Sequence, residues 1–153
     1  MDIFERLVEQ AMKDGIQKVV AGGIIRNSEG KILILSRKAS DSFLPNIDEL
    51  PSGNLDADEG LYDGLVREIF EETGMKIVAI HGYNDHFDYL SGSGKRTRQF
   101  NFVIEPDTEN VVLEEHDAFK WQTPTEALNN PKITSKTKCS IAVYEFNQID
   151  KTS

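Results

Sequence analysis

The sequence has little cysteine, no long apolar run and no excess of positive charge. Its only cysteine is Cys139, which excludes an internal disulfide and a cysteine-based zinc site. The apolar neighbours of Cys139 predict a buried structural thiol, since a reactive one needs an accessible, electropositive setting. No apolar run approaches the ~20 residues of a membrane span. Acidic and basic residues also interrupt the N-terminus, which predicts a protein of a reducing, cytoplasmic compartment with no membrane partner.

The net charge of −9 argues against general binding of nucleic acid, which requires a basic surface. A polyphosphate substrate is also an anion, so a site for it would have to supply positive potential through metal ions and a few local basic residues. A length of 153 residues suits a single domain, 1–153, with one hydrophobic core. Composition therefore favours a metal-dependent enzyme over a protein that binds phosphate backbones.

The most informative stretch runs from residue 53 to residue 75. No proline occurs between Glu59 and Thr73, and Gly74 follows at a position where a left-handed helix cap favours glycine. This pattern predicts a helix. At helical pitch one apolar arc would pack against a sheet, and its members are Tyr62, Leu65, Val66, Ile69 and Phe70.

Three carboxylates lie beside this arc. Glu68 and Glu72 are spaced at i and i+4 on its margin, and Glu71 lies one step toward solvent. Like charges at this spacing destabilise a helix, and Arg67 can reach Glu71 but cannot serve all three acids. A hard divalent cation such as Mg²⁺ or Mn²⁺ can, because it prefers oxygen ligands. For the glutamate pair alone, a solvated acidic face with weak ion pairs is the competing interpretation.

The full pattern favours the metal site. Its constrained positions are all filled, by Gly53, Glu59, Arg67, Glu68, Ile69, Glu71, Glu72, Gly74 and Met75. This stretch resembles the Nudix box, and the sequence is similar to MutT-like Nudix hydrolases. Asn54 departs from many members, which carry a second glycine there.

The resemblance implies an α/β fold, a Nudix-type α/β/α sandwich around a mixed β-sheet. It also implies hydrolysis, with Mg²⁺ or Mn²⁺, of a phosphoanhydride in a nucleoside diphosphate linked to another group. Implied metal ligands are the Gly53 carbonyl and the side chains of Glu68, Glu71, Glu72 and Glu115. Implied catalytic residues are Glu72, Glu68 and Glu115, any of which could be the general base, with Arg67 orienting the glutamates. Glu59 would support the loop.

Two segments precede the box. Residues 2–14 read as an amphipathic helix with Asp2 as N-cap, either for packing or for a homodimer contact. Residues 18–25 and 32–35 predict a β-hairpin. Gly22 and Gly23 within it indicate a bulge or a close approach, by a ligand or by a strand. Arg37 is a candidate substrate contact or a solvated strand end.

A second hairpin follows the box. Residues 76–89 are strand-like with an interruption at 81–84, residues 91–94 form a turn, and residues 96–104 alternate. Lys95, Arg96 and Arg98 form a basic patch, and either they grip phosphate or they are an ordinary charged hairpin tip. Aromatic residues opposite, Phe87 and Tyr89 with His86, could stack a base.

The last third adds one candidate acid and two helices. In Nudix hydrolases a Glu-His pair precedes a strand tryptophan at the spacing of Glu115, His116 and Trp121, although Glu114 or Asp117 could take the role of Glu115. Residues 123–129 predict a short helix with a capping box. Residues 135–148 predict a final helix that buries Ile141, Ala142, Val143, Tyr144 and Phe146.

Three classes of function remain open from the sequence. The first is a pyrophosphohydrolase acting on a nucleoside triphosphate, a nucleotide sugar such as ADP-ribose, or a dinucleoside polyphosphate. The second is a non-catalytic nucleotide sensor with the Nudix fold, although such modules usually lose box acids and none is missing here. The third, an isomerase of allylic diphosphates, would require a catalytic cysteine in an upstream strand segment, whereas Cys139 lies near the C-terminus.

Overall fold

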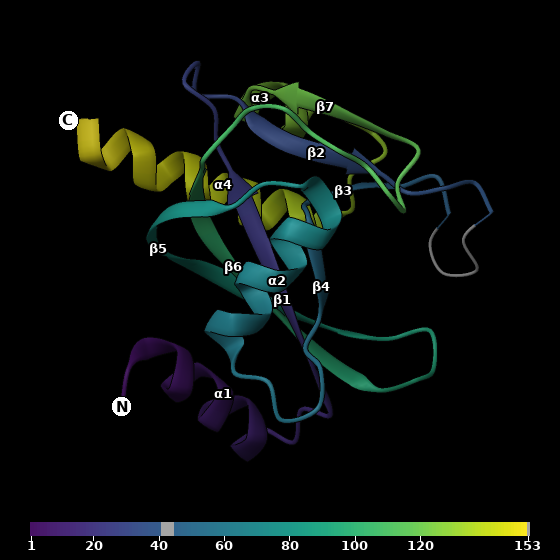
Figure 1. Ribbon diagram of the computed structural model, residues 1–153, viewed down its shortest axis with the longest axis vertical. Coiled ribbons are helices and arrows are strands. Elements are labelled where there is room, and N and C mark those ends of the chain that lie inside the picture. Colours follow the sequence, from purple (N-terminus) through teal and green to yellow (C-terminus); the bar gives the residue numbers. More distant parts are fainter. Residues whose placement is uncertain (41–44, 153) are drawn as a thin grey trace.

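The structure is a computed structural model that describes residues 1–40 and 45–152 (Figure 1). Four helices accompany the strands in these residues: α1 (Ile3–Lys13), α2 (Leu61–Thr73), α3 (Pro124–Leu128) and α4 (Ser135–Thr152). The strands are β1 (Lys18–Ile25), β2 (Ile32–Ser36), β3 (Asp48–Glu49), β4 (Ser52–Asn54), β5 (Ile77–Leu90), β6 (Arg96–Pro106) and β7 (Ala118–Gln122). None of the described helices is long and apolar enough to cross a membrane.

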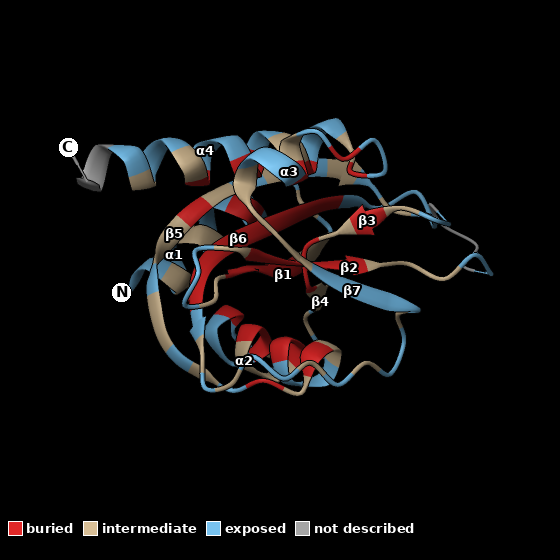
Figure 2. Ribbon diagram, turned by 90° about the horizontal axis from the view of Figure 1, so that it is seen from above, coloured by how far each residue is buried: buried red, intermediate tan, exposed pale blue. Residues whose placement is uncertain are grey.

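The strands form two sheets. One has the order β4-β1-β6-β5 and the other the order β3-β2-β7. β1 and β6 run parallel and the remaining pairs run antiparallel, so the larger sheet is mixed. Helices α3 and α4 cover one side of the strands and α2 covers the other (Figure 2). The predicted α/β/α sandwich around a mixed sheet is therefore confirmed.

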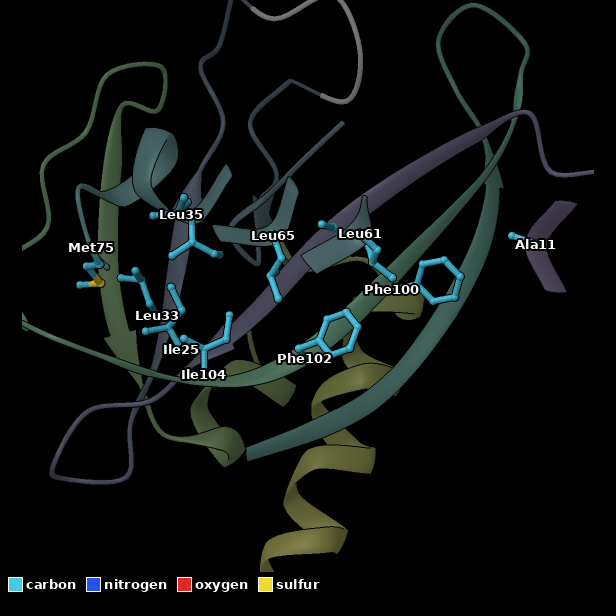
Figure 3. Close-up of a cluster of buried hydrophobic side chains, with 12 residues drawn as sticks. Ala11, Ile25, Leu33, Leu35, Leu61, Leu65, Met75, Phe100, Phe102 and Ile104 are labelled. Atoms are coloured by element: carbon cyan, nitrogen blue, oxygen red, sulfur yellow. The ribbon is translucent and has the colours of Figure 1, made fainter. Parts of the chain in front are cut away.

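Because helices cover both sides, β1 and β2 are apolar on both faces over most of their length. In β2, Leu33 and Leu35 join the cluster beneath α2, whereas Ile32 and Ile34 join the cluster beneath α3 and α4. The first cluster also contains Leu61 and Leu65 of α2 and the rings Phe100 and Phe102 of β6 (Figure 3). These contacts hold α2, and with it the carboxylates on its margin, rigidly against the sheet.

The predicted hairpin between residues 18–25 and 32–35 was wrong, because these two strands do not pair along their length. Both strands exist, but they share only one bridge, between Arg26 and Ile32, and then separate into different sheets. The second hairpin is confirmed, because β5 and β6 pair along their whole length. The predicted interruption at residues 81–84 lies inside β5, where the pairing with β6 shifts register and leaves bulges.

Helix faces were predicted less well. In α2 the apolar arc lies one step round from the prediction: Leu61, Leu65 and Ile69 are buried, whereas Tyr62 and Phe70 are exposed. The buried positions of α4 are Thr137, Ser140, Ile141 and Tyr144, at the spacing of one helix face.

The residues between those positions face away from the sheet. Ala142, Val143 and Phe146 are consequently exposed, which contradicts the prediction. Cys139 is exposed as well, so the predicted buried thiol was wrong: its position on α4 is opposite the buried face.

Gly74 ends α2 in the left-handed conformation, with φ of 75° and its N–H bonded to the Phe70 carbonyl. We expect Gly74→Ala to lower the free energy of unfolding by more than 1 kcal/mol, because a Cβ in this conformation costs roughly 1–2 kcal/mol. That Cβ would also lie 3.1 Å from the Cβ of Val112. Urea unfolding followed by circular dichroism measures the change.

Gly30 provides the matched control. It has nearly the same conformation, with φ of 76°, but an added Cβ would meet no atom within 4 Å. Gly30→Ala should therefore show the conformational cost alone. Equal losses in the two variants would contradict the contribution assigned to the contact with Val112.

Candidate active site

A cleft of about 1190 Å³ is lined in part by strands of the larger sheet. Its lining residues come from β1, β3, β4, the segment between β2 and β3, the later part of α2, the β5–β6 hairpin, the loop before β7 and the start of α4. This volume exceeds the ~300–1,000 Å³ that is usual for small-molecule sites. The cleft is therefore large enough for a nucleotide.

The box residues predicted as ligands meet in this cleft. Gly53, Glu68, Glu71 and Glu72 all line it. An added Cβ at Gly53 would lie 1.7 Å from a carboxylate oxygen of Glu68, which shows how closely that side chain approaches the backbone. Any side chain at position 53 would displace the Glu68 carboxylate.

Arg67 organises the acids around it. Its Nε and Nη2 donate to the two carboxylate oxygens of Glu59, both at 2.8 Å. Nη1 donates to Glu68 at 2.8 Å and to Glu71 at 2.9 Å, and Nη2 also donates to the Asn54 carbonyl at 2.9 Å. One guanidinium thus ties the start of the helix, the loop and two box glutamates together.

Glu72 has a different partner. Its Oε2 lies 3.0 Å from Nδ1 of His116, and the His116 Nε2 lies 2.9 Å from Oε2 of Glu49. The contact between Glu72 and His116 is an ion pair without hydrogen-bond alignment, so both buried atoms lack a hydrogen-bond partner. Sequence reasoning missed Glu49 completely, because no local pattern connects it to His116.

The electrostatics follow from these contacts. Hydrogen bonds from Arg67, and then from the Asp56 backbone, lower the pKa of Glu59 to about 2. Burial raises the pKa of Glu68, although Arg67 acts in the opposite direction. Burial alone would lower the pKa of His116, but the carboxylates of Glu49 and Glu72 raise it to about 9.

The predicted acid outside the box also reaches the cleft. Glu115 and its neighbour Glu114 both line it, whereas Asp117 does not. Both glutamates are exposed and lie in the irregular segment before β7. Of the three acids left open by the sequence, two are consequently placed beside the box.

The predicted substrate contacts divide into two groups. Arg37 lines the cleft, where its Nη1 lies 3.5 Å from Glu49. Lys95, Arg96 and Arg98 do not line it. Arg98 is buried and instead donates to two carboxylates, that of Asp14 at the C-cap of α1 at 2.8 Å and that of Asp88 in β5 at 2.7 Å.

Sequence reasoning missed two basic residues of the cleft. Lys18 lines it from the start of β1 and Lys136 from the start of α4. The predicted stacking residues Phe87 and Tyr89 of β5 line it too, whereas His86 does not. Lys18 and Lys136 carry no local signal, because both are single lysines distant from the box in sequence.

The side chains of the cleft are suitable donors for a divalent metal ion, but they are not already arranged around a metal position. Within residues 1–40 and 45–152, no three acidic, histidine or cysteine side chains are grouped as metal ligands. Arg67 and His116 hold the box carboxylates instead. The chemistry nevertheless suits a hard cation, because the donors are carboxylates and Oε2 of Glu72 is buried without a hydrogen bond.

Several known proteins are similar to this chain in sequence. The NUDIX domain model matches residues 16–142. CTP pyrophosphohydrolase of Escherichia coli is 33% identical over 115 residues, which cover 74% of this chain and 81% of that protein. Nudix hydrolase 8 of Arabidopsis thaliana is 26% identical over 124 residues, or 76% of this chain, but the match spans only 32% of the plant protein.

A solved structure agrees in fold. The MutT protein from Methanosarcina mazei has a TM-score of 0.74 at 22% identity, with 86% of this chain and 94% of that chain covered. The chain belongs to the Nudix hydrolase family, as the resemblance of residues 53–75 to the Nudix box implies.

The contact between Glu59 and Arg67 predicts a pH-dependent stability. Because the pKa of Glu59 is lowered by folding, its contribution is complete above its ordinary value of 4.5 and is lost as pH falls toward about 2. We expect Glu59→Gln to be less stable than the wild type at pH 6 and to approach it near pH 2. Urea unfolding at a series of pH values measures this difference.

Glu5→Gln on the exposed start of α1 is the matched control. Its stability difference from the wild type should vary much less over the same range. A Glu59→Gln difference that stays constant between pH 6 and pH 2 would contradict the assigned ion pair.

Proposed function

We propose that this protein is a metal-dependent pyrophosphohydrolase that cleaves a phosphoanhydride in a nucleoside diphosphate linked to another group. One observation carries the proposal: box carboxylates, an acid outside the box, basic residues and aromatic rings all line a single cleft. Basic and aromatic side chains, which would bind phosphate and stack a base, thus line the same cleft as the acids that hydrolysis would require.

The residues that would hold Mg²⁺ or Mn²⁺ are the Gly53 carbonyl and the side chains of Glu68, Glu71, Glu72 and Glu115. When bound, the metal neutralises phosphate oxygens and lowers the pKa of a coordinated water. The fit is supported by the close approach of Glu68 to Gly53 and by Oε2 of Glu72, which is buried and forms an ion pair with His116 but no hydrogen bond.

The chain's own groups would position the reactants. Arg67 restrains Glu68 and Glu71 through hydrogen bonds of 2.8 and 2.9 Å, and thereby fixes where these carboxylates can act. Water would attack phosphorus and lose a proton to Glu72, Glu68 or Glu115, each of which lines the cleft. The bridging P–O bond would break, and its electron pair would leave with the oxygen of the departing phosphate. Lys18, Arg37 and Lys136 would offset the charge of the phosphates.

Nucleoside triphosphates are the first substrate class to test, because CTP pyrophosphohydrolase is a relative at 33% identity. Nucleotide sugars such as ADP-ribose and dinucleoside polyphosphates complete the panel. A non-catalytic nucleotide sensor would bind these compounds without product formation.

A homodimer and a cytoplasmic location stay predictions, as does the absence of nucleic-acid partners.

Glu72→Gln tests the proposal. The substitution removes one negative charge while keeping the size of the side chain, so it should lower kcat by about 100-fold or more, with the fold intact. The measurement is phosphate and pyrophosphate release from the nucleotide panel with Mg²⁺, with products resolved by chromatography to show which phosphorus is attacked.

Glu29→Gln is the control, because Glu29 is an exposed carboxylate in the turn before β2, outside the cleft. It should hydrolyse substrate at the wild-type rate. The proposal is contradicted if Glu72→Gln turns over substrate at the rate of the unmodified protein. It is also contradicted if the unmodified protein hydrolyses no nucleotide in the panel.

A further inference from the structure

The cleft continues from the box to a row of buried amides on the face of the sheet covered by α4. Gln99 of β6 is 7% exposed and lines the cleft, and Asn101 lies two residues further along the same face at 0%. Both pair with β1, where Gly22 lies opposite Asn101. A Cβ at Gly22 would lie 2.5 Å from Asn101 Oδ1 and 2.7 Å from Gln99 Nε2, so this glycine leaves room for the two amides.

A carboxylate sets the direction of the amide row. Asp85 of β5 accepts hydrogen bonds from the hydroxyl of Ser140 at 2.7 Å and from the amide nitrogens of Asn84 at 2.9 Å and Asn101 at 3.2 Å. The Asn101 nitrogen also donates to Ser140 Oγ at 3.1 Å. Because a carboxylate can only accept, the nitrogen of Asn101 must face Asp85, and its oxygen must face the other way.

This direction passes on to Gln99. The oxygen of Asn101 accepts a hydrogen bond from Gln99 Nε2 at 2.9 Å, which turns the remaining amide atom, Oε1, away from the row. No hydrogen bond to this oxygen comes from the part of the chain that the structure describes, and the oxygen is not among the enclosed, unbonded polar atoms there. The cleft therefore presents a fixed hydrogen-bond acceptor.

Aromatic rings lie beside this acceptor. Phe87 pairs directly with Gln99 across the β5–β6 ladder, and Tyr89 is two residues away on the same face. Both line the cleft, with ring centroids 6.0 Å apart. A ring that packs a base and an oxygen that meets the edge of the base are the two elements of base recognition.

We propose that Gln99 selects the base of the nucleotide, favouring cytosine and adenine, which carry an exocyclic amino group, over uracil and hypoxanthine, which carry an oxygen there. The amino group donates to Gln99 Oε1, whereas an oxygen would face it with two acceptors and no proton. Asp85 is a positioning residue, since it acts only through Asn101. This inference rests on the proposed function and refines its substrate class.

The experiment compares CTP with UTP and ATP with ITP in the same enzyme preparation. The two members of each pair share their triphosphate and differ in the base. Because both are measured in the same preparation, the amount of folded protein cancels from the ratio of their kcat/KM values. The wild type should favour the amino member about tenfold or more, because a lost hydrogen bond leaves the acceptor unpaired. A ratio near one, or a preference for the oxo member, overturns the proposal.

Two variants separate recognition from a structural role. Gln99→Leu removes the acceptor and should bring the ratio near one, chiefly by lowering kcat/KM for the amino member. Asp85→Asn keeps Gln99 but removes the carboxylate that directs the row, so the ratio should also fall. Gln10→Leu on the exposed face of α1 is the control and should keep the wild-type ratio. A Gln99→Leu enzyme with the wild-type ratio overturns the proposal, as does an equal loss on both members.

Failure of the proposed hydrolysis can be distinguished from failure of base selection by Gln99. If no nucleotide is hydrolysed, calorimetric titration of the wild-type protein with CTP and with UTP replaces kinetics. A Kd for CTP about tenfold lower than that for UTP supports the role of Gln99 in a binding protein. Equal Kd values, or no binding of either nucleotide, overturn it.

Discussion

The hydrogen bonds of the Arg67 guanidinium are the contacts on which the box end of the cleft depends. Glu68 is 9% exposed, and a buried carboxylate without a partner would cost several kcal/mol. Arg67 offsets that cost and, through Glu59, ties the turn before α2 to the helix. Its contact with Glu71, whose side chain is 54% exposed, adds little stability. The main contribution of Arg67 is therefore that it fixes the position of the Glu68 carboxylate.

The parts of the fold that could be predicted from the sequence are those set by near neighbours. Gly74 ends α2 because one residue must be left-handed there, and the capping box of Thr123 and Glu126 forms as its spacing indicates. The β5–β6 hairpin follows from alternation around a turn. The carboxylates of the box meet because they share a single helix, so their convergence in the cleft could also be predicted.

The rest depends on contacts between distant segments. Glu49 and His116 are 67 residues apart, and Asp85 and Ser140 are 55 apart, so no local pattern connects either pair. The alternation of β6 was predicted, but alternation does not say whether the polar face meets water or a helix. Here α4 covers it, and Gln99 and Asn101 are buried. The basic residues Arg96 and Arg98 illustrate the same gap, since proximity in sequence did not place them in the cleft.

The two ends of the cleft are organised by groups of opposite character. At the box end Arg67 can only donate hydrogen bonds, so every group around it turns an oxygen inward. At the other end Asp85 can only accept, so each neighbour turns a proton toward it and an acceptor is left facing the cleft. The two networks share no residue in the contacts that the structure describes. The effects of substitutions at the two ends should therefore be nearly additive, because distant networks without shared partners contribute independently.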